Sequence, residues 1–298
     1  MTPHALGAAT AASPAGATRR DWGALALRLL VGAGAAITLA ALAGIVGFIL
    51  VMGVPHLSAD LFVWEYTSEN VSLMPALAST LLMAALALGA AVPVGVAAAV
   101  YSVEYARPGS KLVAAARLTC ETLQGVPSIV FGLFGLLFFT GLLGWGLSLA
   151  SGAATLALMV LPVVVRTTEE ALLAVPQSWR QGSFALGAGR LRTVVRCVLP
   201  SAAPGIAGGV LLALGRCVGE VAALLFTAGT VAQIPDFAAQ GPAALLDSCR
   251  TLATHMYVLA SEGLHVNEAY ACAVVLLALV LIVNLVTNLS MRLLKGDR

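Results

Sequence analysis

The chain has little charge and almost no lysine. Only 10% of its 298 residues are Asp, Glu, Lys or Arg, and the only lysines are Lys111 and Lys295. Neither lies in the Gly-x-x-x-x-Gly-Lys-Ser/Thr pattern that cradles nucleotide phosphates, so we do not expect this chain to hydrolyse ATP or to be an enzyme. It also lacks a basic patch interleaved with aromatic residues, which argues against nucleic acid as a partner.

Metal-ligand spacing and strand periodicity are missing too. The cysteines form no Cys-x-x-Cys pair and no histidine is spaced to share a metal with them, so the sequence predicts no metal, no cofactor and no structural disulfide. Alternating strand patterns of about ten residues, typical of outer-membrane barrels, are absent. The five cysteines are Cys120, Cys197, Cys217, Cys249 and Cys272.

Long apolar runs dominate what is present. Hydrophobic residues make up 60% of the chain and the mean hydropathy is +0.96, which indicates an integral membrane protein. A membrane-spanning helix needs about 20 apolar residues. The sequence therefore predicts an all-α, polytopic fold, with residues 1–25 as a disordered cytoplasmic tail and 26–298 as one transmembrane permease domain. The six predicted spans are 29–53, 74–101, 123–142, 145–165, 204–229 and 268–290.

The basic residues predict the orientation. Fourteen of the sixteen lie before the first span, after the last, or on alternate loops, so both termini are expected to be cytoplasmic. The loops on the other side carry acids instead. The two exceptions are Arg216, inside a predicted span, and Arg250, in an outer loop.

Arg216 and Glu220 lie four residues apart in the fifth predicted span. In a continuous helix this spacing puts both side chains on one face, one turn apart. A charge at the bilayer centre costs at least about 3 kcal/mol, so such residues face a partner helix or a water-filled path. Two interpretations are open: an ion pair that fixes packing, or a charged lining for the path of a polar solute. We favour the second.

The predicted cytoplasmic loop 166–203 carries the most information. Its pattern predicts a break at Pro176, a short helix with Ser178 as N-cap, a glycine turn at 187–189 and a separate basic helix at 190–198. Several residues of this loop are more apolar than a solvent-exposed loop requires, which indicates that the loop docks onto another protein surface.

The loop resembles the coupling segment of bacterial ABC importer permeases. Residues 185–188 (Ala-Leu-Gly-Ala) and the later Leu-Pro match that segment, whereas Gln-Gly-Ser replaces its usual Glu-Ala-Ala. The resemblance implies a type I, MetI-like permease fold and two helices that press into a separate ATPase. The residues implicated in ATPase coupling are Gln181, Gly182, Ser183, Ala185, Gly187, Leu199 and Pro200.

Longer segments are similar to the phosphate importer permeases. These are residues 125–134, 165–176 and 215–229, and residues 252–263 resemble the A subunit of the Pst type. The resemblance covers about 70–290. It implies a multi-pass protein of the bacterial inner membrane, in contact with lipid and paired with a second, related permease. It further implies two ATPase subunits, an extracytoplasmic phosphate-binding protein, and phosphate as the solute.

Arginine suits phosphate because its guanidinium stays charged and presents a planar fork of donors. Arg216 is the candidate in the path, and Glu220 would neutralise it when the site is empty. Arg166 is either an inner receptor for the anion or an interfacial anchor. Importers of sulfate, molybdate or another oxyanion remain alternatives, as do an ion-coupled secondary carrier and a scaffold without transport.

The outer segment 251–260 has apolar residues at 252, 256 and 259, the spacing of one helix face. We expect a helix at the outer surface that packs against spans three and five. The alternative is a gate that meets the docked binding protein, with Asp247 and Glu262 at its ends.

Overall fold

The computed structural model describes residues 22–107 and 109–296. The chain divides into two compact units, Met1–Phe48 and Ile49–Arg298. The described part of the first unit is the N-terminal portion of α1 (Trp22–Gly53), whose residues in this portion are mostly exposed. Residues 22–25, predicted to belong to the tail, are the first turn of this helix. The rest of the predicted tail, residues 1–21, lies outside the described residues.

Every regular element in the described residues is helical, which confirms the all-α, polytopic prediction. Five helices are long and apolar enough to cross a membrane, and a sixth span results if one bent helix pair is counted as a unit. The five are Trp22–His56, Met74–Tyr105, Leu149–Leu173, Arg190–Gly219 and Val266–Thr287.

The core of the second unit forms around one central helix. α5 (Leu149–Leu173) packs against α2 (Met74–Val100) on one side and α8 (Leu199–Gly219) on another. Its apolar residues, including the fully buried Leu156 and Val160, lie in the main hydrophobic cluster. A helix buried on several sides must be apolar nearly all round, which explains the composition of α5 up to Val165, before Arg166 and the acids that follow.

The predicted span 123–142 is a bent pair rather than one helix. α3 (Lys111–Gln124) and α4 (Ser128–Gly135) meet at 104°. The break falls just before α4, whose N-cap is Pro127 with an extended ψ of 140°. Proline also disfavours helical backbone in the residue before it, Val126. After α4 the chain continues as a π-helical segment, η4 (Leu136–Leu142).

The predicted span 204–229 is also interrupted. α8 ends at Gly219, and Glu220 has extended backbone with φ −77° and ψ 130°. The Glu220 carboxylate accepts a hydrogen bond of 3.1 Å from the Ala223 backbone N–H, at the start of α9 (Ala222–Thr227). The prediction that Arg216 and Glu220 share one helix face is therefore wrong, because Glu220 lies outside α8 and satisfies a free donor of the next helix.

The predicted short helix at the loop 166–203 is α6 (Gln177–Ala185). It begins one residue earlier than expected and its N-cap is Pro176, not Ser178. The glycine elbow is confirmed: Gly187 has φ +80°, a backbone conformation that glycine adopts without a steric penalty.

The predicted basic helix 190–198 does not stop before Pro200. α7 (Arg190–Thr193) passes through a π-helical turn, η5 (Val194–Val198), directly into α8, giving one 30-residue helix. Proline lacks an N–H and clashes with the carbonyl four residues earlier. The wider turn lies at that point and accommodates the ring, so the helix continues.

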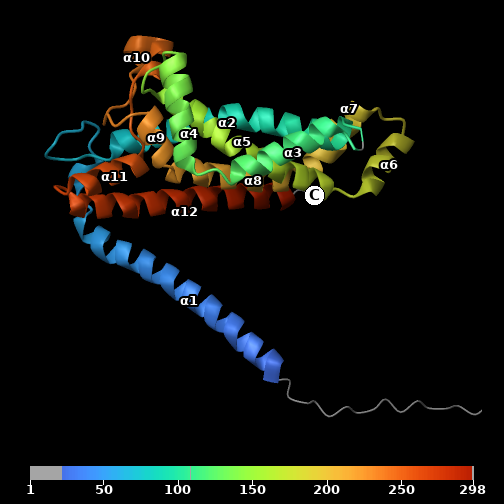
Figure 1. Cartoon of the computed structure of the whole chain (residues 1–298), viewed down its shortest axis with the longest axis horizontal. Helices are drawn as coiled ribbons and strands as arrows, with labels where there is room; N and C mark the ends of the chain where they lie inside the picture. Colours follow the sequence, from blue (N-terminus) through green and yellow to red (C-terminus); the bar gives the residue numbers. More distant parts are fainter. Residues whose placement is uncertain (1–21, 108, 297–298) are drawn as a thin grey trace, which may run out of the picture. The chain divides into compact units, whose positions relative to one another are not determined.

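Figure 1 shows that α6 and α7 lie at one end of the second unit and α10 and α11 at the other. We call these the α6 end and the α11 end. α11 (Leu252–Glu262) confirms the helix predicted at 251–260, and Leu252 and Leu259 are buried. Its main packing partners are α12 (Val266–Gly296) and α2. The expected packing on span five is present as a smaller contact with α8, whereas span three is not among its main partners.

The remaining short elements connect these helices. They are η1 (Val54–His56), η2 (Ala59–Phe62), η3 (Tyr101–Tyr105), α10 (Phe237–Gln240) and η6 (Gly241–Leu246).

Candidate transport and coupling sites

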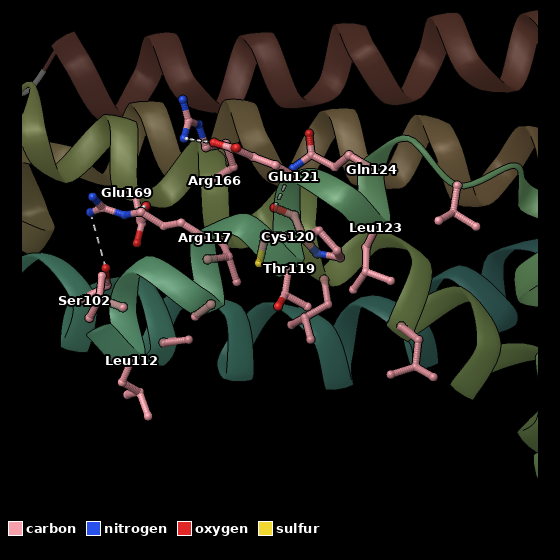
Figure 2. Close-up of a pocket in the computed structure, with 18 of the residues that line it drawn as sticks. Ser102, Leu112, Arg117, Thr119, Cys120, Glu121, Leu123, Gln124, Arg166 and Glu169 are labelled. Atoms are coloured by element: carbon pink, nitrogen blue, oxygen red, sulfur yellow. Dashed lines mark hydrogen bonds and ion pairs between the residues drawn. The ribbon is translucent and has the colours of Figure 1, made fainter. Parts of the chain in front are cut away.

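A cavity of about 720 Å³ lies between α3, α4, α5 and the C-terminal part of α2 (Figure 2). Most of its lining is apolar, and its charged groups come from α3 and α5. These are Arg117, Glu121, Arg166 and Glu169. The cavity therefore combines a mostly apolar wall with charged side chains from α3 and α5.

Arg166, a predicted path residue, already has acidic partners in this cavity. Its Nε is 2.8 Å from Glu170 Oε1 and its Nη1 is 3.5 Å from Glu121 Oε1. All three side chains are about half exposed, so solvent screens both pairs and each contributes little to stability. An anion could displace these weak contacts. In the described structure, however, Arg166 is a paired residue at the edge of the cavity.

Arg117 and Glu169 form a second ion pair, which sequence reasoning missed. Arg117 Nε lies 3.0 Å from Glu169 Oε2, and its Nη2 lies 3.4 Å from Ser102 Oγ (Figure 2). The Glu169 side chain is 5% exposed. The pair thus joins α3 and η3 to the central helix. The available signal was Glu169 itself, an acid just past the predicted end of span four.

Arg216 lies apart from this cavity, on a half-buried position of α8. Gly215 and Gly219, beside it on the helix, have no atoms of other elements within 4 Å of where a Cβ would stand. Among the described residues, Arg216 has no carboxylate within 4.0 Å. The three predicted path residues are therefore not brought together: Arg216 borders an uncovered face, Glu220 caps α9, and Arg166 lines the cavity.

The predicted coupling residues do gather at the α6 end. Gln181, Gly182, Ala185 and Gly187 are exposed on α6 and its elbow. Ser183 Oγ lies 2.8 Å from Thr193 Oγ1, which holds α6 against α7. Leu199 and Pro200 lie half-buried at the start of α8. Next to them, Leu186 is 90% exposed and Leu191 is 69% exposed. Exposed apolar side chains that lie close together are typical of interaction surfaces.

A buried ion pair anchors α6, and sequence reasoning missed it as well. Arg180 Nη2 and Nε lie 2.7 and 3.0 Å from Glu104 Oε1, and both side chains are 9% exposed. The same guanidinium donates to the carbonyls of Val175 at 2.7 Å and Leu172 at 2.8 Å. A single arginine thus ties α6 to η3 and to the end of α5, so α6 is held as part of the bundle. In the sequence, Arg180 could not be distinguished from the other basic residues of the predicted loop.

The chain is similar to known transport proteins along most of its length. Residues 91–296 match the family described as binding-protein-dependent transport system inner membrane component. A probable ABC transporter permease protein, YqgI, of Bacillus subtilis is 36% identical over 266 residues, covering 87% of this chain and 90% of that protein. The phosphate transport system permease protein PstA 1 of Mycobacterium tuberculosis is 44% identical over 154 residues, 52% of this chain and 50% of that protein. The chain thus matches about half the length of the mycobacterial relative.

Solved structures share the fold. The bacterial alginate ABC transporter in complex with a pentasaccharide-bound periplasmic protein has a matching chain with a TM-score of 0.65 at 17% identity, covering 93% of this chain and 96% of that one. The inward-facing MetNI methionine ABC transporter gives a TM-score of 0.58 at 22% identity, covering 74% and 94%. At these identities the likeness establishes the architecture, and it confirms the predicted MetI-like type I fold.

Proposed function

Because the chain belongs to the family of binding-protein-dependent transport system inner membrane components, and is thus an ABC importer permease, we propose that it conducts inorganic phosphate. The proposal is supported above all by the PstA permeases of several bacteria, which are 35–44% identical to this chain. Arg216, in an otherwise apolar span, offers the planar donor fork that phosphate accepts.

We further propose that the driving ATPase docks on the α6 end. The chain has no phosphate-cradling lysine motif, so hydrolysis belongs to other subunits. The exposed apolar side chains at Leu186 and Leu191, together with the firmly anchored α6, supply a rigid surface for such a partner. In this arrangement two ATPase subunits lie on the cytoplasmic side, as do both termini, and a phosphate-binding protein meets the α11 end.

A second, related permease completes the proposed path. Among the described residues, nothing lies within 4 Å of where a Cβ would stand at Gly215 or Gly219, the glycines beside Arg216 on α8. A charge facing lipid is unfavourable, so a partner or a water-filled passage must cover this face. We propose that the passage forms there, between the two permeases, and that Arg216 holds the anion weakly enough for it to be released.

Uptake into proteoliposomes tests the proposal. The full complex with its binding protein should take up phosphate in an ATP-dependent manner and leave sulfate and molybdate outside. Arg216→Gln should lower phosphate uptake at least tenfold, since a hydrogen bond to a charged group contributes about 1.5–3 kcal/mol. The exposed Arg107→Gln is the matched control and should transport normally.

Three results would count against the proposal. Uptake of sulfate or molybdate in preference to phosphate would reassign the substrate. Normal uptake by a well-assembled Arg216→Gln complex would remove Arg216 from the path. Failure of this variant to assemble, with Arg216→Lys assembling and transporting normally, would make the residue a packing element.

A further inference from the structure

Arg250 is the single basic residue on the loops predicted to face outward, and the structure buries it. It precedes α11 in a segment held by backbone hydrogen bonds, with its N–H donating to the Val231 carbonyl at 3.0 Å and the Cys249 N–H donating to the Ala228 carbonyl at 3.1 Å. The residue is only 5% exposed. Its position is therefore fixed by the surrounding backbone.

The Arg250 guanidinium has unused hydrogen-bond donors. Its Nε and Nη2 are buried and have no hydrogen-bond partner among the described residues. No carboxylate of the described residues lies within 4.0 Å of it. Its main contact is the ring of Tyr66, whose centroid lies 4.8 Å from Cζ. Cation–π contact with one face leaves the in-plane donors free.

No group among the described residues forms an ion pair with this charge. His255 contacts Tyr66 edge to face, with the ring centroids 6.0 Å apart. Burial, and then the positive charge of Arg250, lower the pKa of His255 to about 3, so its ring is neutral at physiological pH. An arginine side chain is a cation in proteins, so the site carries a positive charge with no ion-pair partner among the described residues.

The side chain of Arg250 lines a cavity of about 570 Å³. Trp64, Glu65 and Tyr66 form one part of the wall, and residues 230–234 form another. Glu65 and Gln233 are exposed. The cavity thus has a buried cationic wall, a polar lining and access to solvent, all at the α11 end.

We propose that this cavity is a binding site for a small oxyanion, which is held by the buried guanidinium of Arg250 and its unpaired donors. Two parallel N–H donors match two oxygens of a phosphate or carboxylate group. If the proposed function holds, the anion is phosphate on its way into the path, and Glu65 limits its affinity by repulsion. The site itself rests on the geometry of Arg250 and not on that assignment.

Anion-dependent thermal stabilisation tests the site directly. A ligand that binds the folded state raises its apparent stability in proportion to ln(1 + [L]/Kd). The complete complex, in lipid nanodiscs without binding protein or ATP, should be stabilised by inorganic phosphate more than by chloride at equal ionic strength. Arg250→Gln should reduce the apparent phosphate affinity at least tenfold, and Arg250→Lys should reduce it less, because lysine keeps the charge but loses the fork.

Two substitutions at exposed positions guard against loss of folding. Gln233→Glu adds a negative charge to the lining and should weaken phosphate binding, whereas Glu65→Gln removes one and should strengthen it. Glu69→Gln, at an exposed position outside the lining of this cavity, is the matched control and should change nothing. Affinity unaltered by both Gln233→Glu and Arg250→Gln would overturn the proposal, as would a parent complex that no oxyanion stabilises.

Two further arms separate the proposal from its alternatives. Arg216→Gln should keep phosphate binding at the Arg250 cavity while losing phosphate uptake. If sulfate instead binds at the cavity and is the solute taken up, the assignment of phosphate as the substrate fails, but the anion site at Arg250 is supported. Titration with the binding protein tests whether the oxyanion is a carboxylate of that partner. If Arg250→Gln abolishes docking of the binding protein but leaves phosphate affinity intact, a small-anion site is refuted.

Discussion

Among the described residues, the buried charges Glu104, Glu169 and Arg180 each have an ion-pair partner, whereas Arg250 at the α11 end has no carboxylate within 4.0 Å. Glu104 with Arg180, and Glu169 with Arg117, form close ion pairs between elements far apart in the sequence. Arg250 is as deeply buried, yet two of its donor atoms meet no acceptor in the described residues. Because an unpaired buried charge is costly, the first arrangement is typical of structural support and the second of a site waiting for a ligand.

The contrast is sharpest for Arg180, whose loss should have the largest effect on stability. Arg180→Ala leaves the Glu104 carboxylate buried and unpaired, which should lower the free energy of unfolding by about 3–5 kcal/mol. Thermal unfolding of the purified protein measures this change. Arg250→Ala in anion-free buffer should cost much less, since no ion pair is broken.

A paired replacement provides the control for Arg180. Arg180→Met combined with Glu104→Leu removes both charges and should recover most of the loss, because neither charge is left uncompensated. Arg192→Ala, at an exposed position on α7, should stay within about 0.5 kcal/mol of the parent. Equal losses for Arg180→Ala and Arg250→Ala would remove the distinction between the two ends.

His255 should make the α11 end sensitive to acid. Its pKa is about 3 in the folded protein and about 6.5 when exposed, so below pH 6.5 the unfolded chain binds the proton first. Stability is fully retained above that pH. It should fall by up to about 1.4 kcal/mol per unit as the pH drops from 6.5 toward 3.

Unfolding measured between pH 7.5 and 5 tests this dependence. His255→Gln should flatten the slope in that range, whereas the exposed His56→Asn should not. A parent slope identical to that of His255→Gln would show that the ring is hydrated, and the charge of Arg250 would then be screened.

Gly187 tests the mechanical role of the α6 end with a smaller effect. A β-branched residue is strained at φ +80°, so Gly187→Val should lower stability by about 1–2 kcal/mol and shift the elbow. We expect less phosphate transported per ATP hydrolysed by the reconstituted complex. Gly182→Ala, in the helical part of α6 with open space around it, should have the opposite sign and stabilise by about 0.5–1 kcal/mol. An unchanged transport ratio in Gly187→Val would separate the elbow from coupling.

Much of this architecture could be predicted from hydropathy, because the bilayer sets the length of a span. The positions where these helices break or continue could not be predicted from hydropathy. The run around Glu220 is apolar on both sides, and only the hydrogen bond to Ala223 shows that its carboxylate serves α9. Pro200 was interpreted as a helix end, yet the π-helical turn before it accommodates the ring. Local patterns do not encode such compensations.

For the candidate sites too, the sequence predicted features that depend on local spacing and missed those that depend on long-range contacts. The exposed coupling residues could be found because their spacing is local. The pairs Arg180–Glu104 and Arg117–Glu169 join residues 76 and 52 positions apart, and no local pattern predicts such partners. Arg250 did leave a signal, as the one basic residue among outer acids, but its burial and free donors emerged only from the fold.

The unbroken passage from α7 into α8 makes a long, stiff rod. Its 30 residues correspond to about 45 Å, at about 1.5 Å per residue. Arg216 lies about 39 Å from Arg190 along this axis. A tilt of one degree about the elbow would therefore sweep the guanidinium sideways by about 0.7 Å, so a rotation of only a few degrees at the α6 end carries it across the width of a phosphate oxygen.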